Sequence, residues 1–210
     1  MCYSKNSSII SFTIMATISL YLFIRNKKDY RIIGFLIFGI STMQIAELLM
    51  HLDPECKNKL NRYGSILGLL SLLVIQPIFG LIASLCFSKK IYDSRYIVLY
   101  IWLWVILYIA YIFIFISKWP YDNEFCTNEK ETDSKLSALY WPWTRNNKAG
   151  IYIFYWIFVF LFPSIATSTP IFWIIISLCA FPIARLFTKK NILNESASCY
   201  WGPLKALLIV

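Results

Sequence analysis

Long apolar runs, each bounded by charged or turn-forming residues, are the feature of this sequence that most limits its fold. Six runs have about 17 to 25 residues, the length at which a helix crosses the hydrocarbon core of a bilayer. They cover residues 8–24, 32–50, 63–87, 96–117, 150–166 and 171–187. A seventh apolar segment, 198–210, is either a short span or an interfacial helix. We therefore predict an all-α, polytopic transmembrane helix bundle that forms a single integral membrane domain over residues 1–210.

The composition supports this class of protein. Hydrophobic residues make up 59% of the chain and charged residues only 15%, whereas about a quarter of the residues in a soluble domain are charged. The net charge of +9 would favour a nucleic-acid partner in a soluble protein. Here the Lys and Arg residues stand at the ends of the apolar runs, where they anchor helices beside lipid headgroups. The expected partner is the lipid bilayer, and no nucleic-acid partner is expected.

The positive residues around the first run predict the orientation of the chain. One positive residue, Lys5, precedes this run, and four follow it within the next segment, namely Arg25, Lys27, Lys28 and Arg31. Positive flanks favour the cytosolic side, and the first span usually has the most influence on orientation. We therefore expect the amino terminus of this multi-pass protein to be non-cytosolic.

Cysteines and glycosylation acceptor sequences agree with this orientation. Four cysteines then share the non-cytosolic side: Cys2, Cys56, Cys126 and Cys199. An oxidising compartment allows disulfides there, and we predict a bond between Cys56 and Cys126, although Cys2 with Cys199 and other pairings are also open. The two Asn-X-Ser sequences, at Asn6 and Asn194, fall on the same side as candidate glycosylation sites.

Polar residues inside the second run mark a candidate site. Gln44, Glu47 and His51 recur at i, i+3 and i+7, so a helix places them on one stripe. An ionisable residue within a span is costly, which makes Glu47 a candidate for carrying a proton or binding a cation. The alternative is that Glu47 snorkels to water from near the helix end. His51 can share a proton with Glu47 or lie in the interface, and the two residues are too few to predict a metal site.

The third run contains a second polar feature, Gln76 followed by Pro77. Proline frees the carbonyl of Leu73, four residues back, and the Gln76 amide either satisfies such a group or contacts a solute or ion. In two antiparallel helices joined by residues 51–62, residues whose numbers sum to about 113 to 115 lie level. Gly68 is then expected against Glu47, within a stripe of small residues on the third run.

Several chemistries have no sequence support. The chain has no Gly-rich phosphate loop, no exposed Ser elbow and no pair of intramembrane aspartates, so no cofactor is expected and the balance is against an enzyme. The leading hypothesis is binding or passage of a small solute or ion between the second and third spans. The alternatives are an intramembrane lipid-modifying enzyme that uses Glu47 and His51, and a structural membrane protein without chemistry.

Short motifs along the chain resemble one family. They are Met1-Cys2-Tyr3-Ser4, Glu47, Asp53 with Cys56, Asn61, Gln76-Pro77, Trp141-Pro142 and Cys199-Tyr200-Trp201. The order is similar to that of a family of small polytopic membrane proteins of unknown function, found in microbes and large DNA viruses and often beginning Met-Cys-Trp-Ser. This chain departs from the family pattern at Tyr3 and in its shortened last span. The resemblance implies a membrane architecture and no particular activity.

Overall fold

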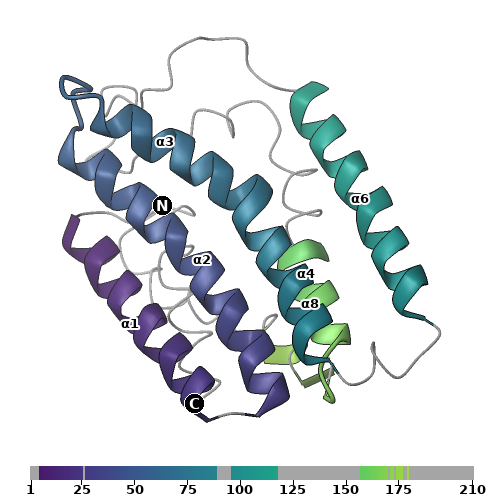
Figure 1. Ribbon diagram of the computed structural model, residues 1–210. Coiled ribbons are helices and arrows are strands. Elements are labelled where there is room, and N and C mark those ends of the chain that lie inside the picture. Colours follow the sequence, from purple (N-terminus) through teal and green to yellow (C-terminus); the bar gives the residue numbers. More distant parts are fainter. Residues whose placement is uncertain are drawn as a thin grey trace.

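The computed structural model describes residues 5–25, 27–88, 96–117, 157–169, 171–172, 174–176 and 179. Within these residues the chain is helical and has no β-strand. Figure 1 shows α1, α2, the continuous α3–α4 helix and α6 following one another across the molecule, with α8 beside α4.

The first two helices, α1 (Lys5–Ile24) and α2 (Lys28–Leu52), form a closely packed antiparallel pair. Their apolar contact consists of Met15, Ile18, Leu22, Ile33, Leu36, Ile37 and Ile40. Gly34 permits the close approach, because a Cβ added there would lie 3.2 Å from the Ser19 carbonyl oxygen. The Ser19 hydroxyl donates a hydrogen bond of 2.8 Å to the Gly34 carbonyl. Such small-residue contacts replace the hydrophobic driving force that helices lack inside a bilayer.

The third helix consists of α3 (Leu60–Leu70), a π-helical turn η1 (Ser71–Ile75) and α4 (Gln76–Phe87). It packs against α2 along its length. Gly64 lies so close to α2 that an added Cβ would be 2.6 Å from the Ala46 carbonyl oxygen. About halfway along α2, Gly39 lies against the ring of Phe79.

The fourth long helix, α6 (Ile97–Ser117), stands at the edge of the bundle. One side of it exposes large apolar residues to the surroundings: Val98, Leu99, Trp102, Leu103, Ile106, Ile109 and Phe113. Aromatic side chains on its inner side contact the short helical segments η4 (Ile157–Leu161) and α8 (Phe162–Ile165). The ring centroids of Trp104 and Phe158 are 5.6 Å apart, and those of Tyr100 and Phe162 are 5.1 Å apart. An apolar exposed side of this kind is suited to contact with lipid.

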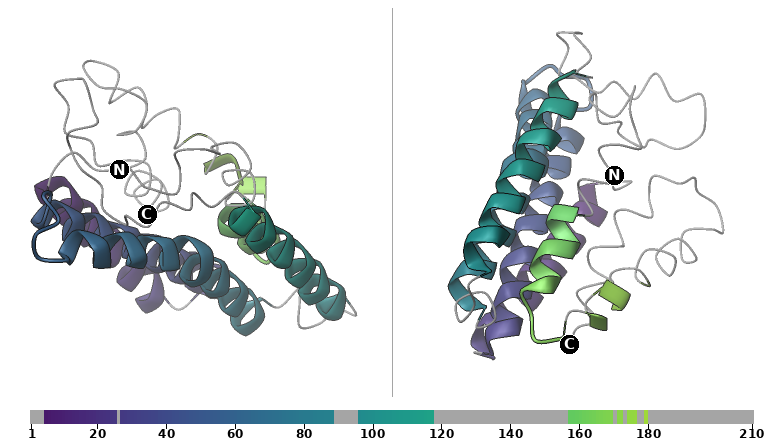
Figure 2. Two further views of the ribbon diagram at one scale, coloured as in Figure 1. Left: turned by 90° about the horizontal axis from the view of Figure 1, so that it is seen from above. Right: turned by 90° about the vertical axis from the view of Figure 1, so that its right-hand side faces the viewer.

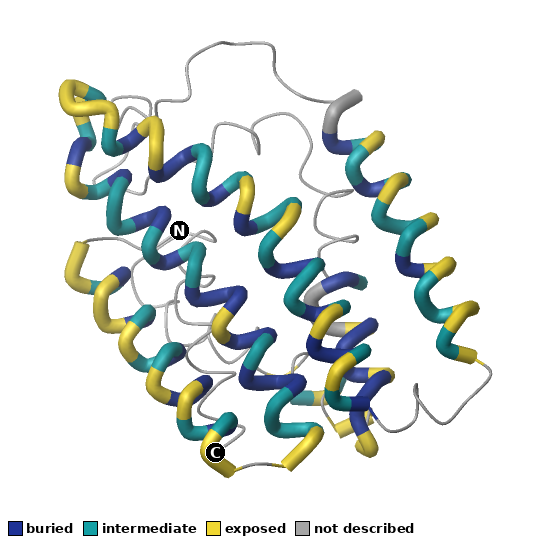
Figure 3. The backbone as a smooth tube through the Cα atoms, in the orientation of Figure 1, coloured by how far each residue is buried: buried dark blue, intermediate teal, exposed yellow. Residues whose placement is uncertain are grey.

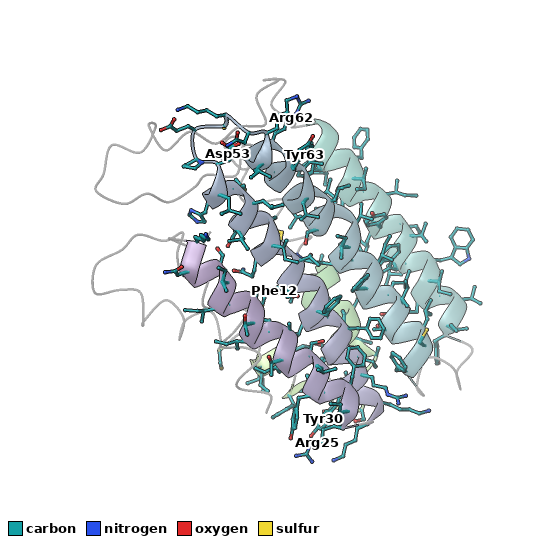
Figure 4. All side chains as sticks on the ribbon, turned by 60° about the vertical axis from the view of Figure 1, so that its left-hand side comes forward. Phe12, Arg25, Tyr30, Asp53, Arg62 and Tyr63 are labelled. Carbon is teal, nitrogen blue, oxygen red and sulfur yellow. The ribbon has the colours of Figure 1, made fainter. Side chains whose placement is uncertain are left out.

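Apart from Glu47, the charged side chains that the structure describes lie toward the two ends of the bundle. Figure 4 shows Arg25 and Tyr30 at one end and Asp53 and Arg62 at the other, with Phe12 between them. At the Arg25 end, the Asp29 carboxylate accepts hydrogen bonds from both the backbone N–H and the hydroxyl of Ser168. The segment after α8 and the α1–α2 turn therefore share one end, as alternating spans predict.

Four helices are long and apolar enough to cross a membrane, namely Lys5–Ile24, Lys28–Leu52, Leu60–Phe87 and Ile97–Phe115. They match the first four predicted spans, and Figure 2 shows them side by side from above. Figure 3 shows α2 as the most buried of them and α6 as the most exposed. Six spans are not confirmed, because much of 150–166, most of 171–187 and all of 198–210 lie outside the described residues.

Candidate functional site

The two central polar residues of α2 are buried. Gln44 is 5% exposed and Glu47 is 4% exposed, while His51, one turn further on, is half-buried. They continue the stripe of α2 whose apolar members pack against α1. Because α2 runs on to Leu52, Glu47 lies about 7.5 Å from the helix end at 1.5 Å per residue. This burial disfavours the alternative in which Glu47 snorkels to water.

Buried serines lie on the side of α1 that faces α2. Ser8, Ser11 and Ser19 are all buried. From the hydrogen bond between Ser19 and Gly34, residues of α1 and α2 whose numbers sum to about 53 lie level. Ser8 is therefore level with α2 between Gln44 and Glu47. Its hydroxyl is buried and has no hydrogen-bond partner among the described residues.

The third helix adds small and polar residues at the same depth. Thr42 and Ser71 join α2 to η1 through a hydrogen bond of 2.5 Å between their hydroxyl oxygens, which confirms the predicted register. In this register Ser65 lies level with α2 next to Glu47. Its hydroxyl is fully buried, and no hydrogen-bond partner for it is seen in the described part of the chain. Gly68 is buried, and its place against Glu47 stays a prediction. We call Ser8, Gln44, Glu47 and Ser65 the outer polar layer.

A second polar group lies deeper. The Gln76 amide nitrogen donates a hydrogen bond of 3.0 Å to the Ser71 hydroxyl, which contacts Thr42. The Thr42 hydroxyl in turn donates to the Gly39 carbonyl at 2.7 Å. Gln76 is fully buried, and its amide oxygen has no hydrogen-bond partner among the described residues. We call Thr42, Ser71 and Gln76 the hydroxyl–amide chain.

The four residues predicted as ligand contacts do not meet at one point. Gln76 lies level with Gly39, since a Cβ added to Gly39 would be 3.6 Å from the Gln76 Cα atom. Glu47 is eight residues further along α2, about 12 Å away along the axis, and His51 is about 6 Å further still. The four residues therefore lie at successive depths from the α2–α3 turn to the middle of α2, and we call them the polar track.

The π-helical turn explains how the third helix accommodates Pro77. The Gln76 backbone N–H bonds to the Ser71 carbonyl, five residues back, and Pro77 itself has no N–H to donate. The Leu73 carbonyl is satisfied by the Tyr108 hydroxyl of α6, at 2.7 Å. The sequence-based expectation that the Gln76 amide could fill this role is wrong, because the amide points to Ser71 instead.

The α2–α3 turn is built around Asp53. This carboxylate is 3% exposed and accepts backbone N–H bonds from Lys57 at 2.8 Å, Asn58 at 3.0 Å and Asn61 at 3.4 Å. The last of these caps the first turn of α3, which has no cap from the side chain of Lys59. Asp53 therefore fixes the path of the chain between the two helices of the site.

The other groups that the sequence singled out near the turn are exposed or already form a disulfide bond or an ion pair. Cys56 takes part in a disulfide bond whose partner lies outside the described residues, as do Cys126, the predicted partner, and Asn194. Lys57 forms an ion pair with Glu55. The hydrogen bond and the charge of Glu55 raise the pKa of Lys57 above its ordinary value. Asn6 is exposed in the first turn of α1, and its glycosylation stays a prediction.

Metal-binding clusters are not seen in the described part of the chain: no three His, Cys, Asp or Glu residues gather there. The polar groups of the track are instead the amides of Gln44 and Gln76, the Glu47 carboxylate and the His51 imidazole. They can accept hydrogen bonds, and the carboxylate can hold a positive charge.

Sequence reasoning missed three contributors to this region. The α1 serines recur at i, i+3 and i+11, a helical spacing that was available as a signal. Thr42 falls three residues after Gly39 on the stripe that contacts α3. Tyr108 gave no signal, because its role depends on the position of α6 beside the π-helical turn.

The comparisons with known proteins add no relative. No family model matches the chain, and neither does any curated protein or solved structure. The family resemblance based on short motifs therefore stays a hypothesis, and the function has to be argued from the site.

Proposed function

We propose that this multi-pass membrane protein binds a small solute or ion in the polar track, which follows α2 along its contacts with α1 and α3, and passes it along the track. The observation that carries the proposal is the burial of Glu47, at 4% exposure, within a helix of membrane-spanning length. A buried ionisable group in such a helix is costly and usually serves a function. Glu47 is the charged group of the proposed site, His51 lies on the approach to it from the α2–α3 turn, and Gln44 lies about one helical turn deeper.

The residues of the track favour a positively charged solute over an anion. Residues 32–50 and 63–87 contain Glu47 but no Lys or Arg. A cation that reaches the residues of the track therefore meets a carboxylate and hydrogen-bond acceptors and no Lys or Arg side chain from these two segments. The negative charge of the Glu47 carboxylate would repel an anion.

A flux measurement tests this function. We expect sealed proteoliposomes containing the protein to take up at least one of H⁺, Na⁺, K⁺ and methylammonium under an imposed membrane potential. Glu47→Gln should reduce that uptake about 10-fold or more, because it removes the charge and keeps the size of the side chain. Glu55→Gln is the matched control, since it makes the same change at an exposed position of the α2–α3 turn.

Uptake that is equal in Glu47→Gln and the control would contradict the proposal. So would the absence of uptake of all four cations by the wild-type protein. Thermal unfolding of each variant in the same lipid separates a loss of function from a loss of fold.

We further propose that the end of the bundle with the α2–α3 turn faces the non-cytosolic side. Cys56 lies at this end, and the free, exposed Cys86 lies near the other end of α4. After reduction, a membrane-impermeant thiol reagent applied to intact cells should label Cys56 and should reach Cys86 only after permeabilisation. The reverse order of labelling would contradict the orientation.

A further inference from the structure

The Gln76 amide oxygen is a polar atom without an internal partner near the middle of the bundle. Gln76 is fully buried, and no described donor reaches its Oε1 atom. Burying a carbonyl oxygen without a hydrogen bond is unfavourable, and such groups in folded proteins usually have a reason to exist. Gln76 lies level with Gly39, which is about halfway along α2, so it is far from either end of the bundle.

The direction of the hydroxyl–amide chain determines which atom of the Gln76 amide has no hydrogen-bond partner. The Thr42 hydroxyl has one hydrogen, and the contact with the Gly39 carbonyl requires that hydrogen. The Ser71 hydroxyl must then donate to Thr42, so it can only accept from Gln76. The chain thus runs from the Gln76 NH₂ group to Ser71, Thr42 and the Gly39 carbonyl.

The opposite direction leaves one contact without a hydrogen. If Ser71 donated to the Gln76 oxygen, Thr42 would donate to Ser71, and its oxygen would face the Gly39 carbonyl oxygen at 2.7 Å. Two oxygens at that distance without a hydrogen repel each other. The arrangement therefore presents the amide of Gln76 to its surroundings as an acceptor.

An acceptor at this point selects the chemical class of the ligand. A bare metal ion needs several oxygen ligands at once, whereas each N–H of an ammonium group needs one acceptor. The carboxylate of Glu47 at the outer part of the track attracts positive charge. Residues 32–50 and 63–87 contain no Lys or Arg that would repel a cation. The π-helical turn that precedes Gln76 is of a kind often found at functional sites.

We propose that Gln76 Oε1 accepts a hydrogen bond from a small protonated amine, making Gln76 the inner binding residue of the track. The inference rests on the proposed function and adds to it the ligand class and a second binding position, about 12 Å deeper than Glu47. Ser71 and Thr42 are positioning residues, because they act through the orientation of the amide.

Binding of radiolabelled methylammonium to the full chain in lipid nanodiscs tests this assignment. We expect saturable binding by the wild-type protein and a weakening of about 10- to 100-fold in Gln76→Met, the loss of one charge-assisted hydrogen bond. Ser84→Ala is the matched control, because Ser84 is also buried on α4 and its hydroxyl donates to the Gly80 carbonyl, outside the hydroxyl–amide chain. The control should bind as the wild type does.

A second variant tests the direction of the chain and guards against misfolding of the first. In Thr42→Val, the Ser71 hydroxyl is free to donate to the Gln76 oxygen and satisfy it internally. Methylammonium binding should therefore weaken several-fold although Gln76 is intact. If Gln76→Met does not fold, this variant decides the question.

The outcomes separate this inference from the proposed function. Weakened binding in Glu47→Gln together with unchanged binding in both Gln76→Met and Thr42→Val would overturn the inference and leave the proposed function standing. Absence of methylammonium binding by the wild type would also overturn the inference, whereas the proposed function would still be judged by the four-cation uptake measurement.

Discussion

Replacing Gly64 with alanine is expected to lower the free energy of unfolding by about 2 kcal/mol or more, and leucine should prevent the native packing of α2 on α3. The added Cβ would lie 2.6 Å from the Ala46 carbonyl oxygen and 3.0 Å from the Met50 backbone nitrogen. Both are backbone atoms of a buried helix, so the helices themselves must separate. Unfolding of the purified protein in mixed micelles, followed by circular dichroism, measures the change.

Gly39→Ala is the control for this prediction. Its added Cβ would approach the Phe79 side chain at 3.3 Å, and a ring can shift by a few tenths of an ångström without moving the backbone. The loss of stability should be clearly smaller than for Gly64→Ala. Equal losses at the two positions would show that the close approach at Gly64 does not limit the packing.

Replacing Asp53 with alanine is expected to destabilise the α2–α3 hairpin by about 3 kcal/mol, because three backbone N–H groups lose a charged acceptor. Asparagine keeps the shape of the side chain but not its charge and should have an intermediate effect. The disulfide of Cys56 can hold the turn in place, so unfolding should be measured with and without reductant, and the effect should be larger when the protein is reduced.

Glu55→Ala is the matched carboxylate change on the same turn. Glu55 is exposed and pairs with an exposed lysine, and such pairs contribute little to stability. A cost for Glu55→Ala similar to that for Asp53→Ala would indicate that the negative charge of the turn matters and that the specific hydrogen bonds of Asp53 do not.

The first four spans could be predicted from the sequence because their signal is local. Apolar runs of bilayer length between charged residues mark 8–24, 32–50, 63–87 and 96–117, and helices occupy all four regions. The boundaries moved at the α2–α3 turn, where α2 extends to Leu52 and α3 begins at Leu60. The Asp53 cap allows the helices to include polar residues that the hydropathy pattern assigns to the loop.

The depth of the candidate residues was partly predictable. Antiparallel helices with a common rise place Thr42 level with Ser71, as the hydrogen bond between them confirms. The same rule separates Gln76 from Glu47 in depth, which shows that two conspicuous polar residues need not share one site.

Features that depend on contacts between distant segments could not be predicted. The bond from Tyr108 to the Leu73 carbonyl requires α6 to lie beside the π-helical turn. The burial of the Asp53 carboxylate requires the whole turn to fold around it. Neither the period of the apolar residues nor the spacing of the polar ones carries this information.

The central claim is that the buried polar track binds a small solute or ion, and a structure determined in lipid nanodiscs with methylammonium present tests it most directly. The account predicts non-protein density within about 3 Å of the Glu47 carboxylate or of Gln76 Oε1, and weaker density in a matched sample without methylammonium. The absence of such density beside both groups in either sample would contradict it.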